Sequence, residues 1–468
     1  MFCNGYFRLY EYITSLTESF RMVHVNQCLV DSESKKTKRN LVSQYFTKSV
    51  SSSDATESDS QMSLSPLSSS SVKKIKTKKW QSVPQRQNPS ARIPHTLFLR
   101  DFFRSGCSVF FSHFHTDHMQ GLTKKFIGDI FATPTTCNLV ANKFQIDRHH
   151  LHPLRIGEHY YLTNCKTQHI PAVMEWIHRE DPSYPLNSTS LILNENVSDS
   201  ALQTRLVRVD VIDANHCPGS CMFLFSLFDW NETTDPHKPS FHLFYRVLYT
   251  GDFRFESRML DDGILRRFSD NRGESLDLLM VDNTYNNEAY NFPRQQCVVN
   301  TAAWVLDRFW RDGLHRGSDL VVLIESYSVG KENLWLHLAK TFDLPSVRKR
   351  ERKARIACYE EFESVYKQHI TTEKTDTPLW VGMARGKLFR DPAETAQFQR
   401  VVVLSPTGWT WEEVSKKKKP DDPELCAYSF RRKGNRITIG LPYSEHSSCD
   451  ELDEFLERLN YKEIEFIV

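Results

Sequence analysis

The chain has 468 residues, with 60 Lys and Arg against 58 Asp and Glu, so its net charge excludes neither acidic nor basic partners and only local clusters of charge are informative. Its 11 cysteines lack the spacing of a disulfide framework and no secretory signal is apparent, which indicates free thiols in a reducing compartment. No apolar stretch reaches the ~18–20 residues that cross a bilayer, so we expect a soluble intracellular protein of two or three domains with no membrane partner.

Residues 1–89 are expected to form a largely disordered N-terminal region that is rich in serine and lysine. Serine makes up more than half of the segment 51–71, and lysine-rich clusters lie at 35–39 and 73–79. Such clusters are typical of nuclear localisation signals or nucleic-acid contacts, although a solvated tail explains them equally well. We expect a nuclear protein whose tail is available to protein partners.

From Ile93 onward, apolar strand-like runs alternate with helix-length amphipathic segments, a pattern typical of an α/β protein. The expected helices cover 297–311, 331–342 and 449–460. The expected strands lie at 108–111, 207–212, 222–227, 247–249, 278–281, 320–324, 401–404, 437–439 and 463–468. We expect a surface loop at 171–190. We also expect His149, His150 and His152 to be surface residues in a connector.

The segment 113–118 reads His-Phe-His-Thr-Asp-His and directly follows the first expected strand. Residues two apart on a strand point the same way, so His113 and His115 share a face. Asp117 and His118 can join that face only if the chain turns there. Polar groups packed this tightly are costly to bury without partners, so the segment indicates metal ligands.

Four more residues that can bind a metal come directly after later strand-like runs. They are His216, Asp252, Asp282 and His446. A single Asp after a strand is usually a turn or helix cap, but four such endings after the 113–118 segment indicate one shared metal site. Cys217 and Cys221, which lie beside the first of them, are expected to be buried thiols.

Together with motifs at 282–285, 327–332, 406–410 and 443–448, this series resembles the β-CASP branch of the metallo-β-lactamase fold. Within that branch it is similar to the DNA cross-link repair nucleases of the Artemis and Apollo type, and most of all to the 5′ exonucleases. The resemblance runs from Ile93 to Val468. It implies an αββα sandwich, the metallo-β-lactamase domain, at 90–282 plus 441–468, with an α/β β-CASP domain inserted at 283–440.

The resemblance also assigns ligands to one or two Zn²⁺ ions. One zinc would be bound by His113, His115 and His216, a second by Asp117, His118 and His446, with Asp252 as the bridge. The implied catalytic residues are Asp117, Asp282 and His446. The donor set agrees with this assignment, because structural zinc sites are usually cysteine-rich whereas this set has no Cys. Two metals would lower the pKa of a water toward neutrality. Asp282 is left to orient a ligating histidine or to transfer a proton.

The β-CASP insertion implies a nucleic-acid substrate, and Val468 bears on which one. At the family's usual interval after the histidine motif, DNA-processing members carry Val and RNA-processing members carry His. A place in the apolar core is the alternative explanation of Val468. The family's catalytic region continues beyond this point, so the resemblance also implies a truncated C-terminal part.

A pocket for a 5′-phosphate would distinguish an end-directed exonuclease. The candidate residues are Ser328, Lys331, Thr407 and Ser444. For the Ser and Thr hydroxyl groups, hydrogen bonding within a turn or a helix cap is the alternative explanation. Lys331 is the strongest, because it lies at an expected helix start where backbone amides also favour an anion.

The resemblance implies a zinc-dependent deoxyribonuclease, a 5′-phosphate-dependent 5′-to-3′ exonuclease acting in interstrand cross-link or double-strand break repair in the nucleus. Its partners would be single-stranded or duplex DNA ends, with repair proteins on the tail. Three alternatives stay open: an Artemis-like structure-specific endonuclease, an RNA-processing endonuclease, and a catalytically impaired, truncated scaffold.

Overall fold

The computed structural model describes residues 79–86, 90–163, 170–183, 191–193, 204–231, 240–270, 272–316, 319–347, 350–382 and 392–468. The basic cluster at 35–39, the serine-rich segment 51–71 and the expected disordered tail up to residue 78 therefore lie outside the described residues. Within the described ranges, no helix is both long enough and apolar enough to cross a membrane.

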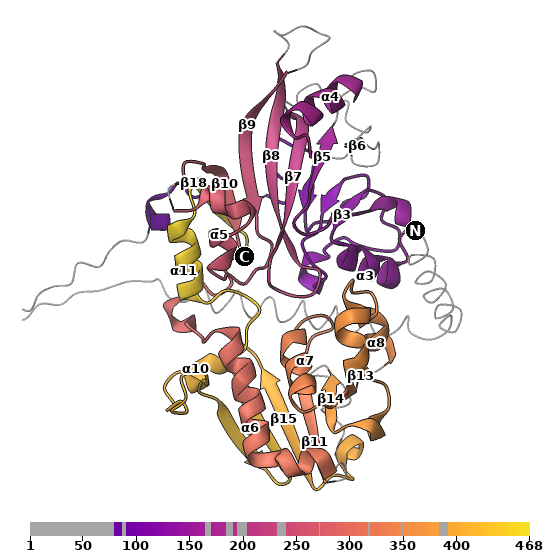
Figure 1. Cartoon of the computed structure of the whole chain (residues 1–468), viewed down its shortest axis with the longest axis vertical. Helices are drawn as coiled ribbons and strands as arrows, with labels where there is room; N and C mark the ends of the chain where they lie inside the picture. The colour runs from indigo at the N-terminus through magenta and orange to yellow at the C-terminus, as the bar shows by residue number, and fades with distance from the viewer. Residues whose placement is uncertain are drawn as a thin grey trace, which may run out of the picture. The chain divides into compact units, whose positions relative to one another are not determined.

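The described strands form three sheets (Figure 1). The first is parallel and has the order β1 (Leu99–Arg100), β2 (Val109–Phe110), β3 (Ile130–Ala132) and β4 (Leu151–Pro153). The second is mixed, in the order β18 (Tyr461–Phe466), β10 (Leu276–Val281), β9 (Ser240–Tyr249), β8 (Cys221–Asn231), β7 (Thr204–Asp213), β5 (His159–Thr163) and β6 (Leu191–Leu193).

The third sheet is formed by later residues and is parallel except for its last pair. Its order is β13 (Ile370–Thr371), β12 (Ser346–Val347), β14 (Leu379–Gly382), β11 (Leu320–Glu325), β15 (Arg400–Pro406), β17 (Arg436–Leu441) and β16 (Ser429–Lys433). The helices are α3 (Pro134–Phe144), α4 (Ile170–Glu180), α5 (Arg258–Asp261), α6 (Gln295–Arg316), α7 (Glu332–Thr341), α8 (Arg350–Ile356), α10 (Thr410–Val414) and α11 (Cys449–Arg458). The expected helices and strands are confirmed at these places, except that the strand expected at 463–468 ends at Phe466.

The first two sheets pack face to face, because alternate residues of their strands point into one apolar layer. Phe110 of β2 contacts Phe223 and Phe225 of β8, with ring centroids 5.1 and 4.8 Å apart. The intervening Leu224 points to the opposite face, where it shares a buried cluster with Phe455 of α11. Figure 1 shows α11 and α5 beside the β18–β10 end of this sheet. Helix α3 supplies Leu139 and Val140 to the outer side of the first sheet, so these layers form the predicted αββα sandwich.

The prediction of a surface loop at 171–190 is wrong for the first half of that segment, which forms α4. Val173, Trp176 and Ile177 are buried there, at the spacing of one helical face. The proline at position 171 concealed the pattern, although proline is tolerated in the first turn of a helix. Residues 184–190 lie outside the described residues.

Two smaller expectations are also revised by the structure. Residues 79–86 were expected within the disordered tail, but 84–86 run beside β18, where the Arg86 N–H donates to the Ile464 carbonyl at 2.9 Å. His152 lies on strand β4 rather than in a connector, and its ring stacks on Phe131 with centroids 4.7 Å apart.

Candidate metal centre

The predicted ligands come from loops at one edge of the sandwich. His113 and His115 follow β2, and His118 ends a short 3₁₀ turn at Thr116–His118, the turn that the sequence required. His216 lies in the β7–β8 connection. The end of β9 lies beside both the start of β8 and the end of β10, so the segments that follow β9 and β10 reach the same edge.

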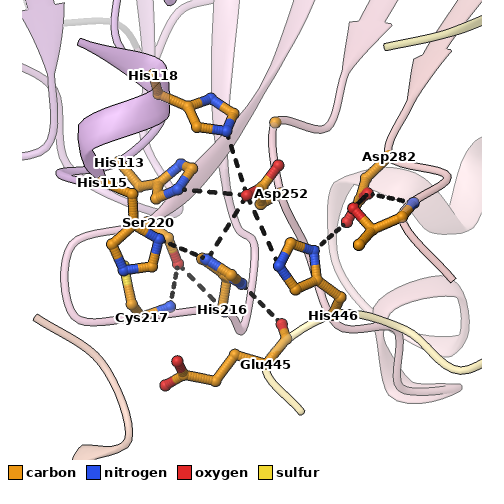
Figure 2. A network of polar contacts seen from close by, with 12 residues as sticks. His113, His115, His118, His216, Cys217, Ser220, Asp252, Asp282, Glu445 and His446 are labelled. Carbon is orange, nitrogen blue, oxygen red and sulfur yellow. Dashed lines mark hydrogen bonds and ion pairs between the residues drawn. The ribbon is translucent and has the colours of Figure 1, made fainter. Parts of the chain in front are cut away.

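The carboxylate of Asp252 lies at the centre of the site (Figure 2). Its Oδ2 atom is 3.2 Å from Nε2 of His118, 3.5 Å from Nε2 of His113, and 3.9 Å from Nε2 of both His216 and His446. Four imidazoles therefore surround one carboxylate oxygen, the arrangement expected around a bridging ligand.

Each of these imidazoles is held through its other nitrogen. The Nδ1 partners are Ser112 Oγ for His113 at 2.9 Å, Asp101 Oδ2 for His118 at 2.8 Å, the Glu445 carbonyl for His216 at 2.7 Å, and Asp282 Oδ2 for His446 at 2.8 Å. Partners of this kind fix the ring orientation and the tautomer of ligating histidines.

His115 is turned the other way round. Its Nε2 donates to the Val329 carbonyl at 3.1 Å, so its Nδ1 faces the centre, 3.1 Å from Nε2 of His216. The outer nitrogens, Nε2 of His115 and Nδ1 of His216, both face carbonyls, which can only accept, so both of these nitrogens carry the proton. If both rings are neutral, their inner nitrogens turn lone pairs toward each other. Two facing lone pairs repel unless a cation lies between them.

Two buried atoms point to the same conclusion. Among the described residues, His113 Nε2 and Asp252 Oδ1 have no hydrogen-bond partner. Buried polar groups without partners are rare and costly, and a metal ion would satisfy both. The donor set of this centre therefore fits a metal ion.

The charge states of the histidines differ across the site. Burial, reinforced by the neighbouring imidazoles, holds the pKa of His113 and of His216 well below the usual value, which favours the neutral rings that bind metals. Burial also acts against the proton on His446, but Asp282 and Asp252 outweigh it and raise the pKa to about 9.

Asp282 is saturated by hydrogen bonds, which favours the orienting role over proton transfer. Besides His446, its carboxylate accepts from the N–H and the hydroxyl of Thr284, at 2.9 and 2.6 Å. Burial opposes its ionisation, but His446 and Thr284 outweigh that effect and lower its pKa.

In the described part of the chain, three groups of side chains bring ligand atoms within 4.8 Å of one another. They are His113 with His115, His216 and Asp252; Asp101 with His113 and His118; and Asp252 with Asp282 and His446. Asp117 belongs to none of them and its side chain is exposed, so its role as a ligand stays a prediction.

Asp101 was not singled out from the sequence. Its carboxylate accepts from His118, from the Ser112 N–H at 2.7 Å and from the Tyr249 hydroxyl at 2.6 Å. The only local signal was an Asp directly after a two-residue strand, which is commonplace.

The candidate phosphate residues are only partly brought together. The Lys331 ammonium is buried, donates to the Pro406 carbonyl next to Thr407, and lies 4.2 Å from the centre of the Tyr327 ring. The Ser444 hydroxyl instead donates to the His446 carbonyl, which favours its turn alternative. Ser328 is partly exposed, and its role as a phosphate ligand stays a prediction.

Three other expectations concern residues beside the centre or at the chain's last strand. Cys217 and Cys221 are free, buried thiols, as predicted. The core alternative for Val468 is wrong, since its side chain is 69% exposed and follows β18.

Comparison with known proteins agrees with this geometry. Residues 366–465 match the family model described as DNA repair metallo-beta-lactamase. The DNA cross-link repair protein SNM1 of Arabidopsis thaliana is 27% identical over 379 residues, which cover 79% of this chain and 63% of that protein. The chain is therefore similar to the DNA-repair metallo-β-lactamases, as the resemblance of its motifs implied.

Two further relatives extend this likeness. The human DNA cross-link repair 1A protein is 27% identical over 385 residues, which cover 80% of this chain and 30% of that protein. The 5′ exonuclease Apollo of Rattus norvegicus is 28% identical over 255 residues, 53% of this chain and 36% of Apollo. The chain thus spans between 30% and 63% of the length of these three relatives.

Proposed function

We propose that this protein is a metal-dependent DNA nuclease that acts from 5′-phosphorylated ends in interstrand cross-link or double-strand break repair, in the nucleus. The observation that carries the proposal is the convergence of four imidazole Nε2 atoms on Asp252 Oδ2. The family match and the names of the relatives support DNA as the substrate. Val468 supports the same choice.

We propose the same metal ligands that the resemblance implied. His113, His115 and His216 would hold one Zn²⁺, and His118, His446 and Asp117 would hold a second where two are bound, with Asp252 between them. A His and Asp donor set without Cys supports zinc in an open, catalytic site. When bound, the metal would lower the pKa of a water toward neutrality and offset negative charge on the phosphate.

The chain's own residues would orient and bind. Asp282 and Asp101 keep the rings of His446 and His118 turned toward Asp252. Lys331, with Thr407 beside it, is our candidate for the terminal phosphate, because its ammonium can offset phosphate charge. Ser328 and Ser444 remain weaker candidates for the same role.

The proposed domain division follows the sheets. The metallo-β-lactamase domain would comprise 90–282 plus 441–468, and the β-CASP domain 283–440, which contains all of the third sheet except the last residue of β17. Repair proteins would contact the N-terminal tail.

Cleavage of single-stranded DNA with a 5′-phosphate or a 5′-hydroxyl tests the proposal. The metal-loaded protein should degrade the phosphorylated strand faster, and Asp252→Asn should abolish cleavage, whereas Asp262→Asn at an exposed site should not. Cleavage of RNA but not of the matched DNA would refute the substrate. Hairpin opening without preference for a 5′-phosphate would favour the endonuclease.

A further inference from the structure

Two large aromatic side chains next to the metal centre are exposed. Trp409 is 63% exposed and Tyr327 is 53% exposed, whereas most large apolar side chains in the described part of the chain are buried. Single exposed aromatic residues are common on protein surfaces, so exposure alone indicates nothing. Their position relative to the ligands is what sets these two apart.

A continuous line of rings joins the two side chains through the metal centre. The ring of Tyr327 is 6.2 Å from that of His115, which is 5.0 Å from His216. On the other side His216 is 4.7 Å from His446, and Tyr285 then lies 6.0 Å from both His446 and Trp409. One exposed aromatic ring therefore lies at each end of the row of ligating histidines.

Trp409 is held in place although its ring faces solvent. It packs edge-on against Tyr290, with centroids 5.7 Å apart and planes at 90°. The preceding Gly408 lies so close to Tyr285 that an added Cβ would come within 2.7 Å of the phenol oxygen. A ring fixed in this way can bind a flat partner without losing much conformational freedom on binding.

The charges near the two rings differ. The Lys331 ammonium lies 4.2 Å from the centre of the Tyr327 ring, so its positive charge favours a phosphate near this ring. Near Trp409, the Glu412 carboxylate accepts from the Tyr290 hydroxyl at 2.8 Å, which disfavours a phosphate there. Trp409 is thus suited to the face of a base, and Tyr327 to a base whose own phosphate is close to Lys331.

We propose that Trp409 and Tyr327 are stacking surfaces for the nucleobases of a single-stranded DNA end, one on each side of the metal centre. The proposal rests on the proposed nuclease function and adds how the strand is bound. Aromatic stacking beside a cationic groove is how proteins bind single strands without reading their sequence. The two rings would hold the bases while the phosphate between them is presented to the metal centre.

Binding of a fluorescent single-stranded oligonucleotide, labelled at its 3′ end and measured by anisotropy in the presence of a chelator, tests this without cleavage. Trp409→Ala and Tyr327→Ala should each weaken binding by roughly five- to a hundredfold, the range for loss of one stacked base. Trp409→Phe and Tyr327→Phe keep a ring and should retain most of the affinity. Phe430→Ala removes an exposed ring from β16 and should have no effect.

The same oligonucleotide with abasic sites at its first nucleotides identifies the contact. The unsubstituted protein should bind the abasic strand more weakly, and the alanine variants should lose little more, because base and ring are two halves of one interaction. Alanine variants that bind like Phe430→Ala, or that are weakened equally on intact and abasic strands, would overturn the proposal. Failure of the nuclease function would look different. The protein would then bind the strand through both rings but would show no metal-dependent cleavage.

Discussion

The backbone N–H of Lys331 donates a hydrogen bond to the Glu445 carboxylate over 2.5 Å. The carbonyl of the same Glu445 accepts from Nδ1 of His216, and the Val329 carbonyl two residues before Lys331 accepts from His115. Glu445 thereby connects the loop before α7 to two histidines of the centre. Its position next to His446 in the sequence indicated none of these contacts.

Glu445→Ala leaves the backbone carbonyl that holds His216. It removes the acceptor of the Lys331 N–H, however, and so loosens the loop whose Val329 carbonyl holds His115. Because this effect on a ligand is indirect, metal affinity should fall by about 10-fold, the low end of the range for losing a group that positions a ligand. Glu445→Gln keeps an oxygen for the Lys331 N–H and should stay within a few-fold of the parent. Chelator competition gives the affinities, and metal content is measured beside them. Equal losses in the two variants would mean that the charge of Glu445, and not its acceptor, matters.

Gly330→Ala should destabilise the fold, because φ at this residue is +112° and an added Cβ would lie 2.7 Å from the Glu445 Oε2 atom. Backbone strain and overpacking together suggest a loss of roughly 2–4 kcal/mol in the free energy of unfolding. Urea unfolding measures it. Gly273→Ala is the matched control, since φ is +99° there but no atom lies within 4 Å of the added Cβ. If Gly330→Ala loses no more free energy of unfolding than the control, the added Cβ does not collide with Glu445.

Asp101→Asn should weaken metal binding by about 10- to 100-fold, because Asp101 orients His118. Both carboxylate oxygens accept from donors, and an amide would turn its NH₂ group toward one of them. Metal competition should show this loss. Asp129→Asn alters an Asp–His pair of 2.9 Å with His152 outside the centre, so its metal affinity should be unchanged.

Removal of the metal should lower the melting temperature by several degrees, because ligands that face one another without a cation repel, and any species that binds only the folded state stabilises it. Adding Zn²⁺ back should restore the temperature in a concentration-dependent way. Differential scanning fluorimetry of the parent and of Asp252→Asn measures both effects. A similar rise in the variant would show that the metal binds elsewhere.

The fold and the ligands were predictable to the extent that they depend on local patterns. Apolar runs along β7, β8 and β10 identified buried strands, and the 113–118 segment identified the site, since both signals lie in neighbouring residues. Asp101 could not be found, because its partner Tyr249 is far along the chain and only the folded sheets bring them together. The contact of Glu445 with Lys331 was hidden for the same reason.

The pairing of β10 with β18 also sets an order of assembly. β10 ends at Val281, while its parallel neighbour begins only at Tyr461, after the whole third sheet has been synthesised. Until then one edge of β10 has no strand beside it, which makes the nascent chain vulnerable to aggregation and its folding slow. Because His446 also arrives late, the nascent polypeptide cannot complete the row of histidines around Asp252 before the intervening sheet has been made.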